Sequence, residues 1–537
     1  MTFEFRDIEG NFDRLPVNYM PQALPYLTGA RDGPGLTVID PSGATRPRPI
    51  EAAVLANPPY LQKFDLPETS YLVPDVLAVR AIPPEPGVLP PPLLAIVDTG
   101  IAFWNPAFRR DGRPLVAGMV YLNFGEPPAV LVDAALNEIL TMADAGVGER
   151  LIHEKLAAHA PQSVFAAGLV RPGQFLHGTG VLDLATRDLS GSDVQVVGYE
   201  LPARALTDRS GDALQGLLTD IIKRIVEEAT NEGFTDVRIL LPYAFLGGPH
   251  NDGHPAVKTL KDAVAQARAS DLSVQLIVPM GNHRQDRQHA VLSEPPVEGA
   301  GPPLTWRLRF DDHSPNTIEF TTSGEETWLL APPTEDFAEV SVRPGGFGLF
   351  VRDGRVIGAL ATRQAGPGLL RTRLSLLPTA GGAVNAPFGD WRIARLQGQG
   401  DARLWILRDD GDRYNSFGRP DRPSEFVDPG YLRRDPSNGH PLNDRAGARV
   451  RRAGTASVMS TAGQAVTSVG AEDLHTGDWG VAAYSGQGTG GENGESFVRV
   501  DEADAPGQRG LLTLGNGSAR RYRFAGTSAA CARFAGR

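Results

Sequence analysis

Three residue types that can cooperate in acyl transfer occur in short segments that lie far apart in the chain. Asp98 follows the apolar run 93–97, His177 opens the sequence HGTG, and Ser528 lies in the sequence GTSAA. A serine hydroxyl is a poor nucleophile until a positioned base takes its proton, and a carboxylate can orient that base. The three segments therefore allow nucleophilic catalysis if the fold brings them together.

Each candidate residue also has an ordinary structural interpretation. The Asp-Thr-Gly sequence at 98–100 forms good turns, a histidine beside glycines is common in loops, and a serine often caps a helix. Asn282 follows a buried apolar run, so it can aim its amide at a developing negative charge or serve as a plain loop residue. Asp-Thr-Gly is also the signature of aspartic proteases, but that class needs a second copy and the sequence has none. The single Cys531 could be a nucleophile, although its small neighbours favour a packed side chain.

The segments around these residues alternate between strand-like and helix-like patterns. Helical spacing covers 129–160, 213–230 and 257–269, and short apolar runs that predict buried strands cover 93–97, 194–197, 237–242 and 274–279. Such alternation predicts parallel βαβ units, whose active-site groups gather at the carboxyl ends of the strands. Residues 300–410 differ, because their short alternating segments predict an antiparallel sandwich.

The length of 537 residues predicts more than one folded unit, because single cores stop growing near ~250–300 residues. Residues 1–90 are expected to form an N-terminal region that closes with the Pro-rich linker 81–92. A propeptide within this region is a further hypothesis. Residues 91–295 and 456–537 are expected to be two parts of one α/β domain, and residues 296–455 a β-rich insert.

Four segments, in this order, resemble those of the subtilisin-like serine peptidases (subtilases). They are the Asp-Thr-Gly box at 98–100, the His-Gly-Thr box at 177–179, the Gly-Asn pair at 281–282 and the Gly-Thr-Ser box at 526–528. Two further segments are similar to family segments: 245–248, in which Phe245 replaces the usual serine, and 466–471 with 484–486 before the serine box. The resemblance covers about half of the chain.

The resemblance implies an α/β fold with a subtilisin-like parallel sheet flanked by helices, interrupted here by a sandwich or jelly-roll-like insert. It implies that Ser528 is the nucleophile, His177 the general base, Asp98 the residue that orients His177, and Asn282 part of the oxyanion hole. The substrate would bind along an apolar pocket and an added-strand edge formed by Leu246, Gly247, Gly248, Met280 and Gly281.

The sequence departs from the family pattern in three places. Gly180 stands where a second histidine is usual, and Ala532 and Arg533 replace Pro-His after the serine box. The chain reaches Arg537 soon after Ser528, so the helix that follows the serine looks truncated. None of these positions belongs to the implied triad.

The implied chemistry needs no cofactor. Structural calcium is frequent in the family, but no calcium-ligand pattern can be carried over to this sequence. His250 and His254 have the spacing i, i+4, yet their Gly-, Pro- and Asn-rich surroundings are those of a loop, and a metal site needs further ligands.

The composition limits which binding partners and which cellular location we expect. A net charge of −11 argues against nucleic acid or an anionic membrane as the main partner. The sequence shows no signal peptide and no apolar run of the ~18 residues that a membrane helix needs. With one cysteine, it is typical of a cytoplasmic protein. We therefore expect a serine endopeptidase that acts on a protein or peptide. The alternative is a catalytically silent subtilase fold that binds a partner through its β-rich insert.

Overall fold

The computed structural model describes most of the chain from residue 91 onward and a few short segments before it. The described residues are 2–7, 36–39, 45–48, 91–110, 112–122, 128–166, 176–189, 194–202, 215–250, 254–269, 272–382, 384–407, 423–435, 439–475, 478–488, 495–499, 510–515 and 521–537. The predicted Pro-rich linker and most of the predicted N-terminal region therefore lie outside the described residues. A short hairpin of β2 (Leu36–Ile39) and β3 (Thr45–Arg48) is described within that region.

A mostly parallel sheet forms the centre of the α/β unit. Its strand order is β24 (Asp478–Val481), β23 (Thr467–His475), β11 (Ser273–Pro279), β10 (Asp236–Leu240), β4 (Leu93–Asp98), β9 (Gln195–Glu200), β7 (Val116–Tyr121) and β8 (Ala129–Leu131), and β25 (Glu495–Arg499) also pairs with β23. The neighbours β11, β10, β4, β9 and β7 are parallel, whereas β8 and β24 run antiparallel to their partners. The strand β4, which carries Asp98, thus occupies the middle of the sheet.

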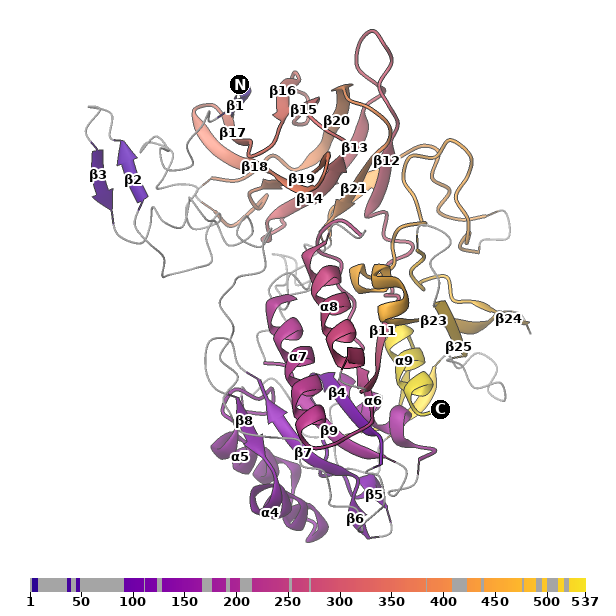
Figure 1. The fold of residues 1–537 in the computed structure, drawn as a ribbon. Coiled ribbons are helices and arrows are strands. Elements are labelled where there is room, and N and C mark those ends of the chain that lie inside the picture. Colours follow the sequence, from indigo (N-terminus) through magenta and orange to yellow (C-terminus); the bar gives the residue numbers. More distant parts are fainter. Residues whose placement is uncertain are drawn as a thin grey trace.

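Helices cover both faces of this sheet (Figure 1). One face packs against α4 (Asp133–Asp144), α5 (Glu149–His159), α6 (His177–Thr186) and α9 (Thr527–Ala535), and the other against α7 (Gln215–Asn231) and α8 (Pro255–Ala269). Side chains of β4 alternate between the two cores, with Leu94 and Ile96 in the first and Leu93, Ala95 and Val97 in the second. A strand buried on both faces explains the continuous apolar run in the sequence.

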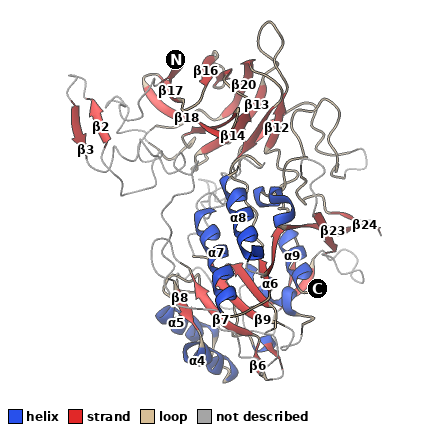
Figure 2. Ribbon diagram, viewed as in Figure 1, coloured by secondary structure: helices blue, strands red, loops and turns tan. Residues whose placement is uncertain are grey.

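The second unit is a sandwich of antiparallel sheets, which Figure 2 shows as a region of strands beyond the helices. The larger sheet has the order β1 (Phe3–Asp7), β17 (Phe347–Arg352), β18 (Arg355–Gly366), β19 (Leu369–Leu376), β14 (Asn316–Thr322), β21 (Ala402–Ile406) and β12 (His289–Leu292). The smaller has the order β16 (Ala338–Val342), β15 (Glu326–Ala331), β20 (Gly389–Gln397), β13 (Leu304–Leu308) and β22 (Glu425–Val427). Apolar side chains from both sheets, including Trp306 and Trp391, form one core between them.

Two strands of the sandwich come from outside the predicted insert boundaries. β1, at the start of the chain, pairs with β17, so that Phe3 lies opposite Arg352. β12 begins at His289 and pairs with β21. The remaining short elements are the 3₁₀ helices η2 (Pro106–Phe108) and η4 (Val458–Ala465) and the strand pairs β5 (Arg109–Arg110) with β6 (Arg113–Pro114) and β26 (Leu511–Leu514) with β27 (Arg521–Phe524).

The fold predicted from the sequence is confirmed: a parallel sheet flanked by helices, with a β-rich insert. One segment differs in detail, because the stretch 129–160 begins with strand β8 before α4 and α5. Its two helices separate at Gly146, which has a left-handed φ of 73°, and at Gly148, where α5 begins. Within the described part of the chain, we find no helix that is both long and apolar enough to cross a membrane.

Candidate active site

Asp98 and His177 form the closest pair of candidate residues. Asp98 is the last residue of β4 and is 6% exposed, while His177 is the first residue of α6. The Nδ1 atom of His177 lies 2.9 Å from Oδ1 and 2.8 Å from Oδ2 of Asp98. This geometry keeps the proton of a neutral imidazole on Nδ1 and leaves Nε2 as the basic nitrogen.

The start of α6 docks directly on the loop that follows β4. The backbone N–H of Gly178 donates to Thr99 O at 2.9 Å, and that of Thr179 donates to Gly100 O at 3.1 Å. The Thr179 hydroxyl donates to Gly100 O and accepts from the N–H of Ala102, both at 2.9 Å. These bonds fix the end of the strand against the start of the helix, and so hold the two side chains in register.

Glycine at position 178 is a steric requirement of this docking. A Cβ atom there would lie 2.7 Å from the carbonyl oxygen of Thr99 and 2.8 Å from the side chain of Ile101. The first of these neighbours is backbone, which cannot rotate away. The small residue after His177 therefore sets how closely α6 approaches Asp98.

The charge of Asp98 changes the basicity of His177. Burial by itself lowers the pKa of His177, but the negative charge of Asp98 and its hydrogen bond act in the opposite direction and prevail, so the pKa is raised. The His177 side chain remains 37% exposed, and its ring meets the edge of Phe524 with centroids 5.2 Å apart. A partly exposed imidazole with a raised pKa can take a proton from a neighbour and return it.

Ser528 lies in the first turn of α9, the helix that packs against α6. Its Oγ donates a hydrogen bond to Pro242 O, at the end of β10, over 2.9 Å. Among the described contacts of Ser528, the hydroxyl therefore bonds to the sheet and not to His177. Phe524, four residues before Ser528, touches the ring of His177 and so brings the segment that leads to the serine next to the histidine.

Asn282 is held beside the serine by Thr527. Its Oδ1 accepts from the backbone N–H of Thr527 at 3.0 Å and from the Thr527 hydroxyl at 3.1 Å. The same hydroxyl accepts from the N–H of Gly281 at 3.1 Å. With its oxygen fixed in this way, the side chain of Asn282 keeps Nδ2 as the group that can donate to an oxyanion.

Sequence reasoning did not single out Thr527 as a functional residue. Its position inside the Gly-Thr-Ser box was the only signal available, and a threonine before a serine has no chemistry of its own. The structure assigns it a supporting contact, because it joins the serine helix to Asn282.

The predicted substrate-binding residues lie on two neighbouring segments. Leu246, Gly247 and Gly248 follow β10, and Met280 and Gly281 follow the adjacent strand β11. The two segments touch, since a Cβ on Gly281 would lie 3.2 Å from that of Ala244. All five residues are buried.

Hydrogen bonds from Ser457 and Val458 hold these two segments in place. Ser457 Oγ accepts from the N–H of Phe245, and the N–H groups of Ser457 and Val458 donate to Met280 O and Phe245 O. The insert also reaches here, because a Cβ on Gly248 would meet Arg371 of β19 at 2.7 Å. The cleft edge is therefore in direct contact with the β-rich unit.

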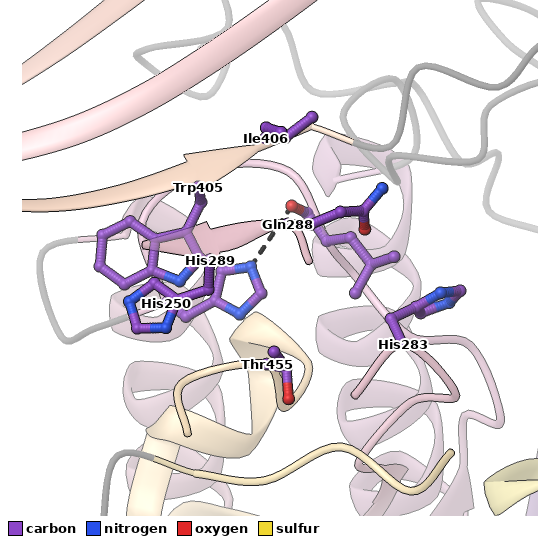
Figure 3. Close-up of a pocket in the computed structure, with 8 residues that line it drawn as sticks. His250, His283, Gln288, His289, Trp405, Ile406 and Thr455 are labelled. Carbon is purple, nitrogen blue, oxygen red and sulfur yellow. Dashed lines mark hydrogen bonds between the residues drawn. The ribbon is translucent and has the colours of Figure 1, made fainter. Parts of the chain in front are cut away.

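A small pocket lies where the two units meet (Figure 3). Trp405 of β21 is stacked on the rings of His250 and His289, with centroids 5.6 and 4.9 Å apart, and these three rings gather on one side, away from His283. The complete lining is Leu246, His250, His283, Gln288, His289, Trp405, Ile406 and Thr455. Since Leu246 also belongs to the substrate segment, this pocket borders the predicted cleft.

Two of these histidines are neutral in the fold. Burial lowers the pKa of His250 to about 4 and that of His289 to about 3, and backbone hydrogen bonds to Ala456 and Ala453 oppose the shift only in part. In the described part of the chain, no cluster of three or more His, Cys, Asp or Glu side chains could hold a metal ion. A neutral His250 ring has one N–H to donate: Nδ1 lies 2.6 Å from Ala456 O, and Nε2 lies 3.3 Å from Leu246 O.

Comparison with known proteins gives structural likenesses and no sequence match. No family model and no curated protein matches the chain. The structure of the CspB protease of Clostridium perfringens is similar over 83% of this chain and 82% of that one, with 16% identity and a TM-score of 0.54. The fold is that of a subtilisin-like protease.

A second similar structure is the PatG macrocyclase domain, at 13% identity over 35% of this chain and 55% of that one. Its TM-score of 0.17 is too low to bear on the fold. At 16% identity, the likeness to the CspB protease shows the fold alone. The roles of the individual residues in this chain remain predictions.

Replacing Gly178 with alanine tests the docking of α6. We expect Gly178→Ala to lower the free energy of unfolding by about 1–3 kcal/mol, since the added methyl group meets backbone. We also expect it to lower the reactivity of Ser528, because Asp98 and His177 move apart. Urea denaturation and covalent labelling measure the two effects. Gly148→Ala is the control, because a Cβ there meets nothing within 4 Å; equal effects of the two substitutions would contradict the steric requirement.

The two neutral histidines should make stability depend on pH. Their folded pKa values lie below the unfolded value of 6.5, so the stability that they contribute is present above pH 6.5. It falls as the pH drops through the window from 6.5 toward 4 and 3, because only the unfolded chain then binds the protons. Each histidine contributes a slope of about 1.4 kcal/mol per pH unit in that window.

Urea denaturation between pH 8 and pH 5 measures this slope. His289→Gln should reduce it, whereas His159→Gln, at a partly exposed position on α5, should leave it unchanged. A slope that persists in His289→Gln and in His250→Gln would show that other groups cause it.

Proposed function

We propose that this chain is a serine endopeptidase of the subtilisin type that cleaves peptide bonds through an acyl-enzyme. The observation that carries the proposal is the Asp98–His177 pair, held at 2.8–2.9 Å at the carboxyl end of the central strand in a protease fold. Two contacts support the assignment of the other two groups: Asn282 is hydrogen-bonded to Thr527, the residue before Ser528, and Phe524 of the same segment touches His177. No cofactor takes part in the proposed reaction.

Attack by Ser528 requires its hydroxyl to leave Pro242 O and turn toward His177. Nε2 of His177 then accepts the hydroxyl proton while Oγ forms a bond to the substrate carbonyl carbon. Asp98 stabilises the imidazolium that results. The negative charge moves to the former carbonyl oxygen, where Nδ2 of Asn282 and the N–H of Ser528 at the start of α9 donate to it.

Collapse of this tetrahedral intermediate breaks the peptide C–N bond. His177 gives its proton to the leaving amine, and the acyl group stays on Ser528 Oγ. A water molecule, deprotonated by His177, then attacks the ester and releases the acid. The same base and the same oxyanion donors serve both halves of the reaction.

The substrate of the proposed enzyme is a protein or peptide bound along residues 245–248 and 280–282. An extended backbone would pair with Gly247 and Gly248, and an apolar side chain would enter beside Leu246 and Met280. Because these residues are buried against the segment 455–458 and the insert, substrate entry would displace neighbouring side chains. A reducing cytoplasm suits the buried single cysteine, Cys531.

A fluorophosphonate probe tests for an activated serine. We expect labelling of the purified chain at Ser528, located by mass spectrometry, and its loss in Ser528→Ala and in His177→Ala. Ser314→Ala, in the insert, is the control and should label like the unchanged chain. Absence of labelling in a folded sample would contradict the proposal and favour the alternative, a silent fold that binds through its insert.

The oxyanion role of Asn282 predicts a selective loss of turnover. Asn282→Ala should lower kcat for a peptide substrate by ~10²–10³, the usual cost of one lost oxyanion donor, while KM changes little. Asn385→Ala, which removes turn bonds in the insert, should leave both constants unchanged. Steady-state kinetics measure both constants: a rise in KM with kcat unchanged would assign Asn282 to substrate binding instead.

A further inference from the structure

Glu200 lies next to Asp98 at the carboxyl edge of the central sheet. It is the last residue of β9, and the strand registers place it opposite Asp98 of β4 on one side and Tyr121 of β7 on the other. It is 1% exposed. A carboxyl group at such a position must be satisfied by the protein, because water cannot reach it.

The partners of Glu200 are backbone groups of two loops. Its Oε2 accepts from the N–H of Ile101 at 3.2 Å, and its Oε1 accepts from the N–H of Val164 at 3.1 Å. Ile101 belongs to the loop directly after Asp98, and Val164 follows α5. The side chain therefore ties the Asp98 loop to the segment between α5 and α6.

The Asp98 loop is thus held from two sides. Thr179 of α6 binds its residues 100 and 102 from one side, and Glu200 binds residue 101 from the other. The carboxylate of Asp98 is oriented by this same loop, since the N–H of Thr99 donates to its Oδ1 at 2.7 Å. A loss of either support would let the loop shift relative to His177.

We propose that Glu200 is a positioning residue for the catalytic pair, fixing the loop 99–102 so that Asp98 meets Nδ1 of His177. This inference rests on the proposed function. The hydrogen bonds of Glu200 go to the N–H groups of Ile101 and Val164, so its positioning effect passes through the loop. Nothing in the sequence around Glu200 indicates this role, because the bond to Ile101 spans 99 residues.

Electrostatics explains how a second carboxyl group can lie beside Asp98. Burial raises the pKa of Glu200 to about 8, the charge of Asp98 adds to this effect, and backbone N–H groups of Ile101 and Val164 oppose it. The facing group on β7, Tyr121, also has its pKa raised, by burial and by Glu200. At neutral pH Glu200 keeps its proton and holds the loop without repelling Asp98.

Two substitutions separate the hydrogen bonds of Glu200 from its charge. Glu200→Gln keeps one acceptor oxygen and is neutral at every pH, whereas Glu200→Leu removes both acceptors. At pH 7 we expect kcat and the rate of Ser528 labelling to change little in Glu200→Gln. In Glu200→Leu we expect both to fall by ~10²-fold with KM unchanged, since a shift of about 1 Å in a catalytic group has a cost of that order.

The pH dependence of activity distinguishes the positioning role from a purely structural one, because a purely structural role would leave it unaltered. Above pH 8, Glu200 of the unsubstituted chain loses its proton and places a second negative charge beside Asp98, so its activity should fall. The activity of Glu200→Gln should not change with pH in this range. Glu228→Gln is the control, because Glu228 is also buried, at 3% exposure, but pairs with Arg224 on α7. The pH profile of Glu228→Gln should match that of the unsubstituted chain.

Proton NMR of the His177 Nδ1–H separates this inference from the proposed function. We expect its downfield resonance in the unchanged chain and in Glu200→Gln, and its loss in Glu200→Leu. A chain that shows the resonance but never labels at Ser528 would contradict the proposed function alone. Glu200→Leu with full labelling and an intact resonance, or a Glu200→Gln profile that still declines above pH 8, would overturn the positioning role.

Discussion

The carboxyl end of β4 and the start of α6 approach each other so closely that a side chain at position 178 would strike the backbone of Thr99. This approach brings Nδ1 of His177 to within 2.9 Å of the Asp98 carboxylate. The rest of the candidate site is arranged around it: α9 packs against α6, and its first turn carries Thr527 and Ser528. A wider spacing of β4 and α6 would keep the same residues but would separate Asp98 from His177.

In the proposed mechanism, Ser528 is the residue that must still reorient. Its hydroxyl bonds to Pro242 O, two residues after the end of β10, whereas Asp98 is bonded to His177 and Asn282 to Thr527. Rotation about one side-chain bond is a small conformational step compared with moving a helix. Catalytic hydrogen bonds in unliganded enzymes are often completed only when substrate binds.

The β-rich insert is attached to the same region by packing as well as by chain connection. Trp405 is stacked on both His250 and His289, and Arg371 lies against Gly248 of the predicted substrate segment. Behind Arg371, a buried ion pair with Glu319 fixes the guanidinium within the insert sheet. Movement of the insert would therefore disturb its contact with the predicted substrate segment, because the contact is made by rigid rings and by a paired charge.

The sequence by itself determined the elements and the candidate residues. Apolar runs and helical spacing located β4, β9, β10, β11, α7 and α8, because each pattern reflects which faces of a local element are buried. The ordered boxes around Asp98, His177, Asn282 and Ser528 singled out the residues that the structure gathers at one edge of the sheet. Alternating short segments also sufficed to predict the sandwich.

Only the tertiary structure decided the contacts that join distant segments. It placed β1 beside β17, fixed Asn282 through Thr527, bonded Glu200 to the loop after Asp98, and turned Ser528 toward Pro242. Strand β8 at residues 129–131 likewise formed because β7 offered an edge to pair with, although the surrounding stretch reads as helical. The physical reason is the same in each case. Periodicity reports the local burial of a segment, whereas the partner that satisfies a buried polar group or strand edge depends on how the whole chain packs.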